Sequence, residues 1–129
     1  MTNGLGIKLL MSARKTILLV DDDRSVLTAW MRLLKLLGYR VETAEGGAKG
    51  FDVAKQVQPD LIVTDWLMPD ISGIALCRRF RSDATLAKTP LILATSEHRV
   101  VFDAPIWDDL WQKPVPVATM RESIERLLA

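Results

Sequence analysis

The sequence predicts an α/β fold, in which a doubly wound parallel sheet is covered by helices on both faces. Short apolar, partly β-branched runs alternate along the chain with longer segments whose apolar residues recur every three or four positions. Such alternation is typical of right-handed βαβ units, whose parallel strands are buried on both sides. The chain has 129 residues, 49% hydrophobic and 26% charged, so it can form one domain with an ordinary core.

The first strand and helix have clear signals. Thr16–Val20 reads TILLV, which is typical of a short strand buried on both faces. Ser25–Leu37 has helical spacing, and Gly38 is expected to end that helix. The apolar stripe of the helix is predicted to contain Val26, Trp30, Leu33, Leu34 and Leu37.

A second strand, helix and third strand follow. Arg40–Ala44 is predicted as a strand because its apolar and polar residues alternate. Ala48–Val57 is predicted as a helix that closes before Pro59, and Leu61–Thr64 as the third strand. The inward residues of this helix are expected to be Phe51, Ala54 and Val57.

The rest of the chain continues the alternation. MPDISG is a turn, because proline, aspartate and glycine gather in it. It leads into a predicted helix at Ile74–Arg81, a fourth strand at Leu91–Ala94 and a last helix at Val117–Leu128. The inward residues are expected to be Leu76, Cys77 and Phe80 in the former helix, and Val117, Met120, Ile124, Leu127 and Leu128 in the latter.

Composition narrows the function classes. The formal net charge of +1 gives no electrostatic case for binding nucleic acid or an anionic membrane. No apolar run approaches the roughly 18 residues that a membrane span needs. Cys77 is the only cysteine, which excludes an intrachain disulfide and fits a reducing cytoplasm. Residues 1–14 are interpreted as an N-terminal extension without a function of its own, and Met11 is a candidate natural start.

Polar residues follow the apolar runs at four places. Asp21 and Asp22 come after ILLV, Asp65 after LIV, Thr95 after LILA, and Lys113 after one more short apolar stretch. Parallel α/β sheets bind ligands at the carboxyl ends of their strands, so these side chains should converge. Clustered carboxylates repel one another unless a cation is present, and an all-oxygen cluster suits Mg²⁺. The sequence therefore predicts a Mg²⁺ site there.

Simpler interpretations exist for each residue. An acid at a strand end can cap the next helix, and Asp23 is expected to do so. Two further adjacent acids, Asp21 and Asp22, exceed what one cap needs. Asp65 could be a turn residue, but that role explains neither Thr95 nor Lys113. Cys77 is interpreted as a small core residue rather than a reactive thiol.

Four stretches, ILLVDDD, LIVTDWLMPDISG, PLILATS and DDLWQKP, resemble the receiver domain of two-component response regulators when taken together and in order. The resemblance covers residues 15–129 and implies a flavodoxin-like (βα)5 sheet of strand order 2-1-3-4-5. It implies that Asp65 accepts a phosphoryl group from phosphohistidine. It also implies that Lys113 pairs with Asp65 and that Thr95 contacts a phosphoryl oxygen. Pro114 would fix the turn that aims Lys113.

The resemblance extends to the metal and the partners. Asp22 would bind Mg²⁺ directly, Asp21 through water, and the Leu67 carbonyl and Asp65 would complete the protein ligands. The partner would be a histidine kinase or a histidine phosphotransfer protein, with homodimerisation open. The domain would take up and lose a phosphoryl group without being a turnover enzyme.

The sequence departs from the family between Thr95 and Lys113. This segment is about one helical turn shorter than usual and contains Pro105, so a short or irregular fourth helix is expected. Leu110 stands where most receivers carry an aromatic switch residue, and Trp111 should point to the opposite face.

Three alternatives stay open. The chain could be a docking module with little phosphorylation-driven switching. It could instead be a receiver fragment of a larger regulator or hybrid kinase. A phosphatase of the haloacid dehalogenase type also uses a D-x-D motif, but it would not explain Asp65.

Overall fold

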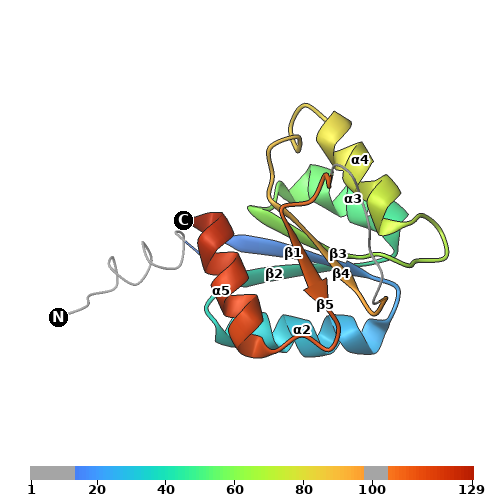
Figure 1. Ribbon diagram of the computed structural model, residues 1–129. Helices are drawn as coiled ribbons and strands as arrows, with labels where there is room; N and C mark the ends of the chain where they lie inside the picture. The colour runs from blue at the N-terminus through green and yellow to red at the C-terminus, as the bar shows by residue number, and fades with distance from the viewer. Residues whose placement is uncertain (1–13, 98–104) are drawn as a thin grey trace.

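The structure is a computed structural model that describes residues 14–97 and 105–129. Five parallel strands form one sheet of order β2-β1-β3-β4-β5 (Figure 1), which confirms the predicted fold class and strand order. The strands are β1 (Thr16–Asp21), β2 (Arg40–Glu45), β3 (Leu61–Asp65), β4 (Leu91–Thr95) and β5 (Asp109–Gln112). The helices are α2 (Arg24–Leu36), α3 (Gly47–Val57), α4 (Gly73–Ser82) and α5 (Val117–Leu128).

Helices cover both faces of the sheet, α2 and α5 on one side and α3 and α4 on the other (Figure 1). Because side chains alternate along each strand, the sheet supplies a separate core to each pair of helices. Leu19, for example, belongs to the α2/α5 core and Leu18 to the α3/α4 core. Cys77 is fully buried in the α3/α4 core, as expected of a small core residue. Burial raises the pKa of its thiol to about 12.

Two details of the predicted helix faces were wrong. Leu27, which the predicted stripe of α2 omitted, is buried against the sheet. Val117 was expected to point inward, but it is 39% exposed because it occupies the first turn of α5, beyond the edge of the core. The predicted ends of α2 hold: Asp23 accepts hydrogen bonds from the backbone N–H groups of Ser25 and Val26, and Gly38 has a φ of 101°.

The connection from β4 to β5 is anchored at its later end. Arg81 of α4 donates to the backbone oxygen of Ile106 and to the Asp108 carboxylate, which also accepts from the Leu91 N–H. The described residues 96–97 and 105–108 are not helical, and the predicted short or irregular fourth helix falls mainly on 98–104, outside the described residues.

Leu110 and Trp111 of β5 were expected to point to opposite faces of the sheet, and this is confirmed. Leu110 is 36% exposed, whereas Trp111 is 1% exposed and packs in the α2/α5 core. In the described part of the chain, no helix has the length and apolar character that a membrane span requires.

Candidate functional site

The sheet register brings the predicted polar residues to one edge. Asp21 follows the pairing of Val20 with Thr64, so it lies beside Asp65 on the neighbouring strand. Asp22 comes next in the chain, and one carboxylate oxygen from each of these three aspartates lies within 4.8 Å of the others. Asp21 is buried, Asp65 is half-buried and Asp22 is exposed, so the cluster opens to solvent on the Asp22 side.

Lys113 completes this edge from the other side. The backbone N–H of Lys113 donates to the Thr95 carbonyl oxygen, which continues the pairing of β4 with β5. The Lys113 Nζ atom lies 3.1 Å from Asp65 Oδ1 and 3.1 Å from Asp21 Oδ2. The bond to Asp65 was predicted, whereas the bond to Asp21 was not. The peptide bond between Lys113 and Pro114 is cis.

Electrostatics at this edge follow from burial and neighbouring charge. Burial and the nearby Asp21 carboxylate raise the pKa of Asp65, although the hydrogen bond from Lys113 opposes them. Burial disfavours the charge on Lys113, but the Asp21 and Asp65 carboxylates outweigh it and raise the pKa of this amine. The site therefore places the charged form of Lys113 beside an acid, Asp65, whose charged form is disfavoured by burial and by Asp21.

Thr95 ends β4 one position beyond the pairing of Ala94 with Asp65. Its side chain is buried, and its Oγ1 accepts a hydrogen bond of 2.9 Å from the Glu97 backbone N–H. That hydroxyl keeps its own proton to donate elsewhere. Thr95 thus stands on the strand next to Asp65, as expected.

Leu67 lies in the loop after β3, two residues beyond Asp65, and its side chain is 56% exposed. The loop is held at both ends by backbone bonds: Trp66 N–H donates to Ala94 O and Gly73 N–H donates to Trp66 O. The apolar Leu67 side chain is therefore exposed on a loop that these two hydrogen bonds hold, two residues after Asp65.

Asp70 in the same loop has a role that the sequence prediction missed. Its carboxylate accepts from the backbone N–H groups of Gly47 and Ala48, at 3.1 and 2.9 Å, and so caps α3 from outside the helix. These bonds, led by the one from Ala48, lower the pKa of Asp70. In the sequence, the sign of this role was indirect: Gly46, the residue before α3, has no side chain that could cap the helix.

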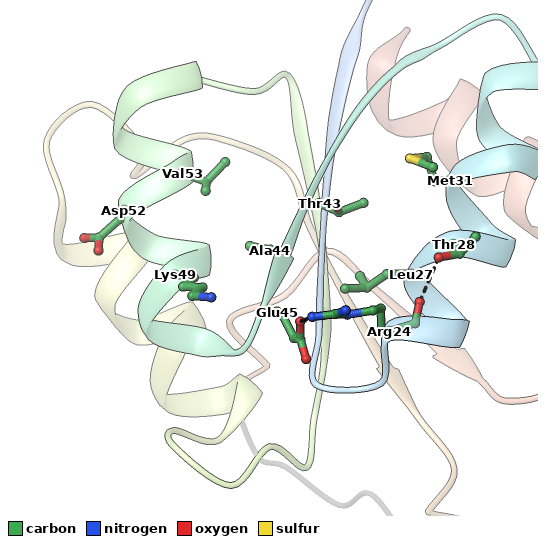
Figure 2. Close-up of a pocket in the computed structure, with 10 residues that line it drawn as sticks. All are labelled: Arg24, Leu27, Thr28, Met31, Thr43, Ala44, Glu45, Lys49, Asp52 and Val53. Carbon is green, nitrogen blue, oxygen red and sulfur yellow. Dashed lines mark hydrogen bonds and ion pairs between the residues drawn. The ribbon is translucent and has the colours of Figure 1, made fainter.

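A hollow of about 360 Å³ lies along the β2 edge between α2 and α3 (Figure 2). Arg24 and Glu45 form an ion pair of 3.1 Å across it, and both are well exposed, so the pair adds little stability. None of the ten residues that line this hollow is Asp22, Asp65, Thr95 or Lys113. This hollow and the carboxylate cluster are therefore separate features of the structure.

Comparisons with known proteins agree with this geometry. Residues 17–125 match the family model of the response regulator receiver domain. The chain is 34% identical over 117 residues to the DNA-binding dual master transcriptional regulator RpaA of Synechocystis, covering 87% of this chain and 48% of that protein. It is 36% identical to the response regulator MprA of Mycobacterium bovis, covering 87% of this chain and 50% of that protein.

A solved structure is similar as well. It is the response regulator TrrA of Thermotoga maritima in complex with Mg²⁺ and BeF, with a TM-score of 0.81, 27% identity, and coverage of 88% of this chain and 99% of that one. The chain spans about half the length of the curated relatives it matches. The strand order, the acid cluster with its lysine, and the family match over 17–125 lead to one conclusion: this chain belongs to the response regulator receiver domain family.

Proposed function

We propose that this domain accepts a phosphoryl group on Asp65 from the phosphohistidine of a histidine kinase or a histidine phosphotransfer protein, in a Mg²⁺-dependent reaction. One observation carries the proposal: Lys113 Nζ lies 3.1 Å from both Asp65 and Asp21, and Asp22 adds its carboxylate to the same cluster. A nucleophilic carboxylate, a fixed cation and a metal-type oxygen cluster are together what phosphoryl transfer needs.

The residues have distinct roles in this transfer. A carboxylate oxygen of Asp65 forms the new bond to phosphorus while the phosphorus–nitrogen bond to the donor imidazole breaks, and the electron pair stays on the imidazole, which takes up a proton. The Lys113 ammonium pairs with a phosphoryl oxygen, and the Thr95 hydroxyl donates to another. Both contacts offset negative charge on the transferring group.

The acid cluster fits a Mg²⁺ ion. Three carboxylates with oxygens within 4.8 Å include one whose pKa is raised by burial and by a neighbouring acid, so a divalent cation would relieve their repulsion. Asp22 and Asp65 would bind the ion directly, together with the Leu67 carbonyl, and Asp21 would act through water. When bound, Mg²⁺ neutralises and orients phosphoryl oxygens.

Asp22→Ala should weaken Mg²⁺ binding more than Asp21→Ala does. Both carboxylate oxygens of Asp21 already accept hydrogen bonds, from Asp23 N–H and from Lys113 Nζ, which leaves Asp22 freer to bind the ion. Loss of an outer-shell group costs about 10- to 100-fold in metal affinity, and loss of a direct ligand should cost more. Titrating Mg²⁺ while following tryptophan fluorescence measures this, because Trp66 adjoins Asp65 and Trp30 lines a hollow with Asp21 and Asp65. Equal affinities in the wild type and Asp22→Ala would exclude this metal site.

Leu67→Asn should shorten the lifetime of the phosphorylated form. The exposed apolar Leu67 cannot hydrogen-bond a water that attacks the phosphoryl group, whereas an amide can. The gain should stay below about 100-fold, since an amide orients water but does not remove its proton. Phosphate loss over time measures it, and Leu67→Ala is the control that opens space without polarity. If Asn and Ala behave alike, side-chain polarity at this position does not set the lifetime.

The wider role follows from the same proposal. Residues 15–129 form the receiver domain, and residues 1–14 are an extension. The domain would work in the cytoplasm, as a phosphoacceptor rather than a turnover enzyme, alone or as a homodimer. The downstream response to phosphorylation would be produced by a domain linked to this one or by a protein that binds it. A docking module without phosphorylation would not require Lys113 to be held between two carboxylates, so this alternative is not favoured.

A further inference from the structure

Lys113 has a third neighbour besides the two carboxylates. Its Nζ atom lies over the ring of Trp30, 5.6 Å from the ring centroid. An ammonium within about 6 Å of a tryptophan face is attracted by the ring quadrupole. Trp30 belongs to α2 and its position fits the core stripe of that helix, so its contact with Lys113 was not part of the sequence prediction.

The Trp30 ring is itself fixed in place. It packs edge to face against Trp111 of β5, with ring centroids 5.9 Å apart and planes at 66°. Trp111 is 1% exposed and lies in the core between the sheet and α2 and α5. A buried ring therefore supports Trp30 on one side, and Lys113 contacts it on another.

Trp30 also lines two hollows, one beside the acid cluster and one beside Lys113. It lines a small hollow of about 10 Å³ together with Asp21 and Asp65. It lines a second, mainly apolar hollow of about 440 Å³ together with Lys113 and Pro114. The ring therefore adjoins both the two carboxylates and the lysine side chain.

We propose that Trp30 is a positioning residue for phosphoryl transfer, whose ring face holds the Lys113 ammonium at Asp65. This inference rests on the proposed function. A lysine side chain has four rotatable bonds and loses considerable entropy when fixed in one geometry. The two carboxylates hold the ammonium, but their pull on it changes once Asp65 carries a phosphoryl group. The ring face holds the ammonium from a side that the reaction leaves unchanged.

A pair of substitutions separates the aromatic face from simple packing. Trp30→Phe keeps a ring face, whereas Trp30→Leu keeps apolar bulk without one. Leu37→Ala is the control, because Leu37 packs against the same core at the other end of α2. Two quantities are measured on each folded protein: the rate of labelling by acetyl phosphate with Mg²⁺, and the NMR shifts of the Lys113 ε-methylene, assigned with Lys113→Ala.

The wild-type Lys113 methylene should be shifted upfield by the ring current. Trp30→Leu should abolish this shift and slow labelling by about 3- to 10-fold, the rate equivalent of losing a cation–π contact. Trp30→Phe should keep part of both, and Leu37→Ala should keep both. Equal slowing in Trp30→Phe and Trp30→Leu, or an unshifted lysine in the wild type, would overturn the inference.

The two readouts also separate this inference from the proposed function. If the wild type is not labelled at all, phosphoryl transfer and the role of Trp30 in it are both overturned. If the wild type is labelled and its lysine is unshifted, the proposed function stands and the inference about Trp30 alone fails.

Discussion

Asp65→Asn is expected to abolish phosphoryl labelling. An amide is a far poorer nucleophile toward phosphorus than a carboxylate, and Asp65 is the half-buried acid in contact with Lys113. The substitution keeps the size of the side chain and an oxygen that can accept from Lys113 Nζ. Loss of labelling would therefore report lost chemistry rather than lost structure.

The measurement is incorporation of phosphate from acetyl phosphate or a phosphorylated histidine kinase, with Mg²⁺ present. Asp52→Asn makes the same chemical change at an exposed carboxylate of α3 and should label like the wild type. The phosphate should be lost in base and retained in mild acid, as for an acyl phosphate. Full labelling of Asp65→Asn would mean that another residue is the acceptor.

Gly73→Ala should be the most destabilising single-methyl change near the site. A Cβ atom at Gly73 would overlap the backbone carbonyl oxygen of Asp65 at the end of β3. No rotamer change relieves a clash with backbone, so the loop or the strand end must move. We expect a loss of about 3 kcal/mol in the free energy of unfolding, measured by urea denaturation. Labelling of the folded fraction should also fall, because the displaced residue is the acceptor.

Gly47→Ala is the matched comparison. Its Cβ would overlap the Cγ2 of Ile71, a side chain that is only half-buried and can be shortened. We expect a smaller loss, of about 1–2 kcal/mol, and partial recovery in the double variant with Ile71→Ala. If Gly73→Ala and Gly47→Ala lose the same stability, the backbone contact at Asp65 is not the tighter constraint.

The parts of this molecule that sequence patterns predict are those encoded locally. Apolar runs and the acids that follow them place β1 and β3, and hence Asp21 and Asp65, because residues at the ends of adjacent parallel strands must meet. The two ends of α2, at Asp23 and Gly38, could also be predicted from the sequence, because capping depends on the few residues around each helix end.

What the patterns missed depends on which distant segments meet. Asp70 caps α3 from 22 residues away, and Lys113 reaches Asp21 across 92 residues. Trp30 contacts Lys113 only because α2 and β5 are brought together by the fold. The spacing within α2 shows that Trp30 faces inward, but not which side chain it faces. Residues of this kind look like ordinary core or turn positions in a single sequence.

Locating the phosphate directly tests the central claim. After labelling with acetyl phosphate and Mg²⁺, borohydride reduces an aspartyl phosphate to homoserine, which changes the mass of one residue in a peptide digest. Our account predicts this conversion at Asp65, and its absence when Mg²⁺ is removed by a chelator. Conversion at Asp21 or Asp22 instead, or no conversion in fully folded protein with donor and Mg²⁺ present, would contradict it.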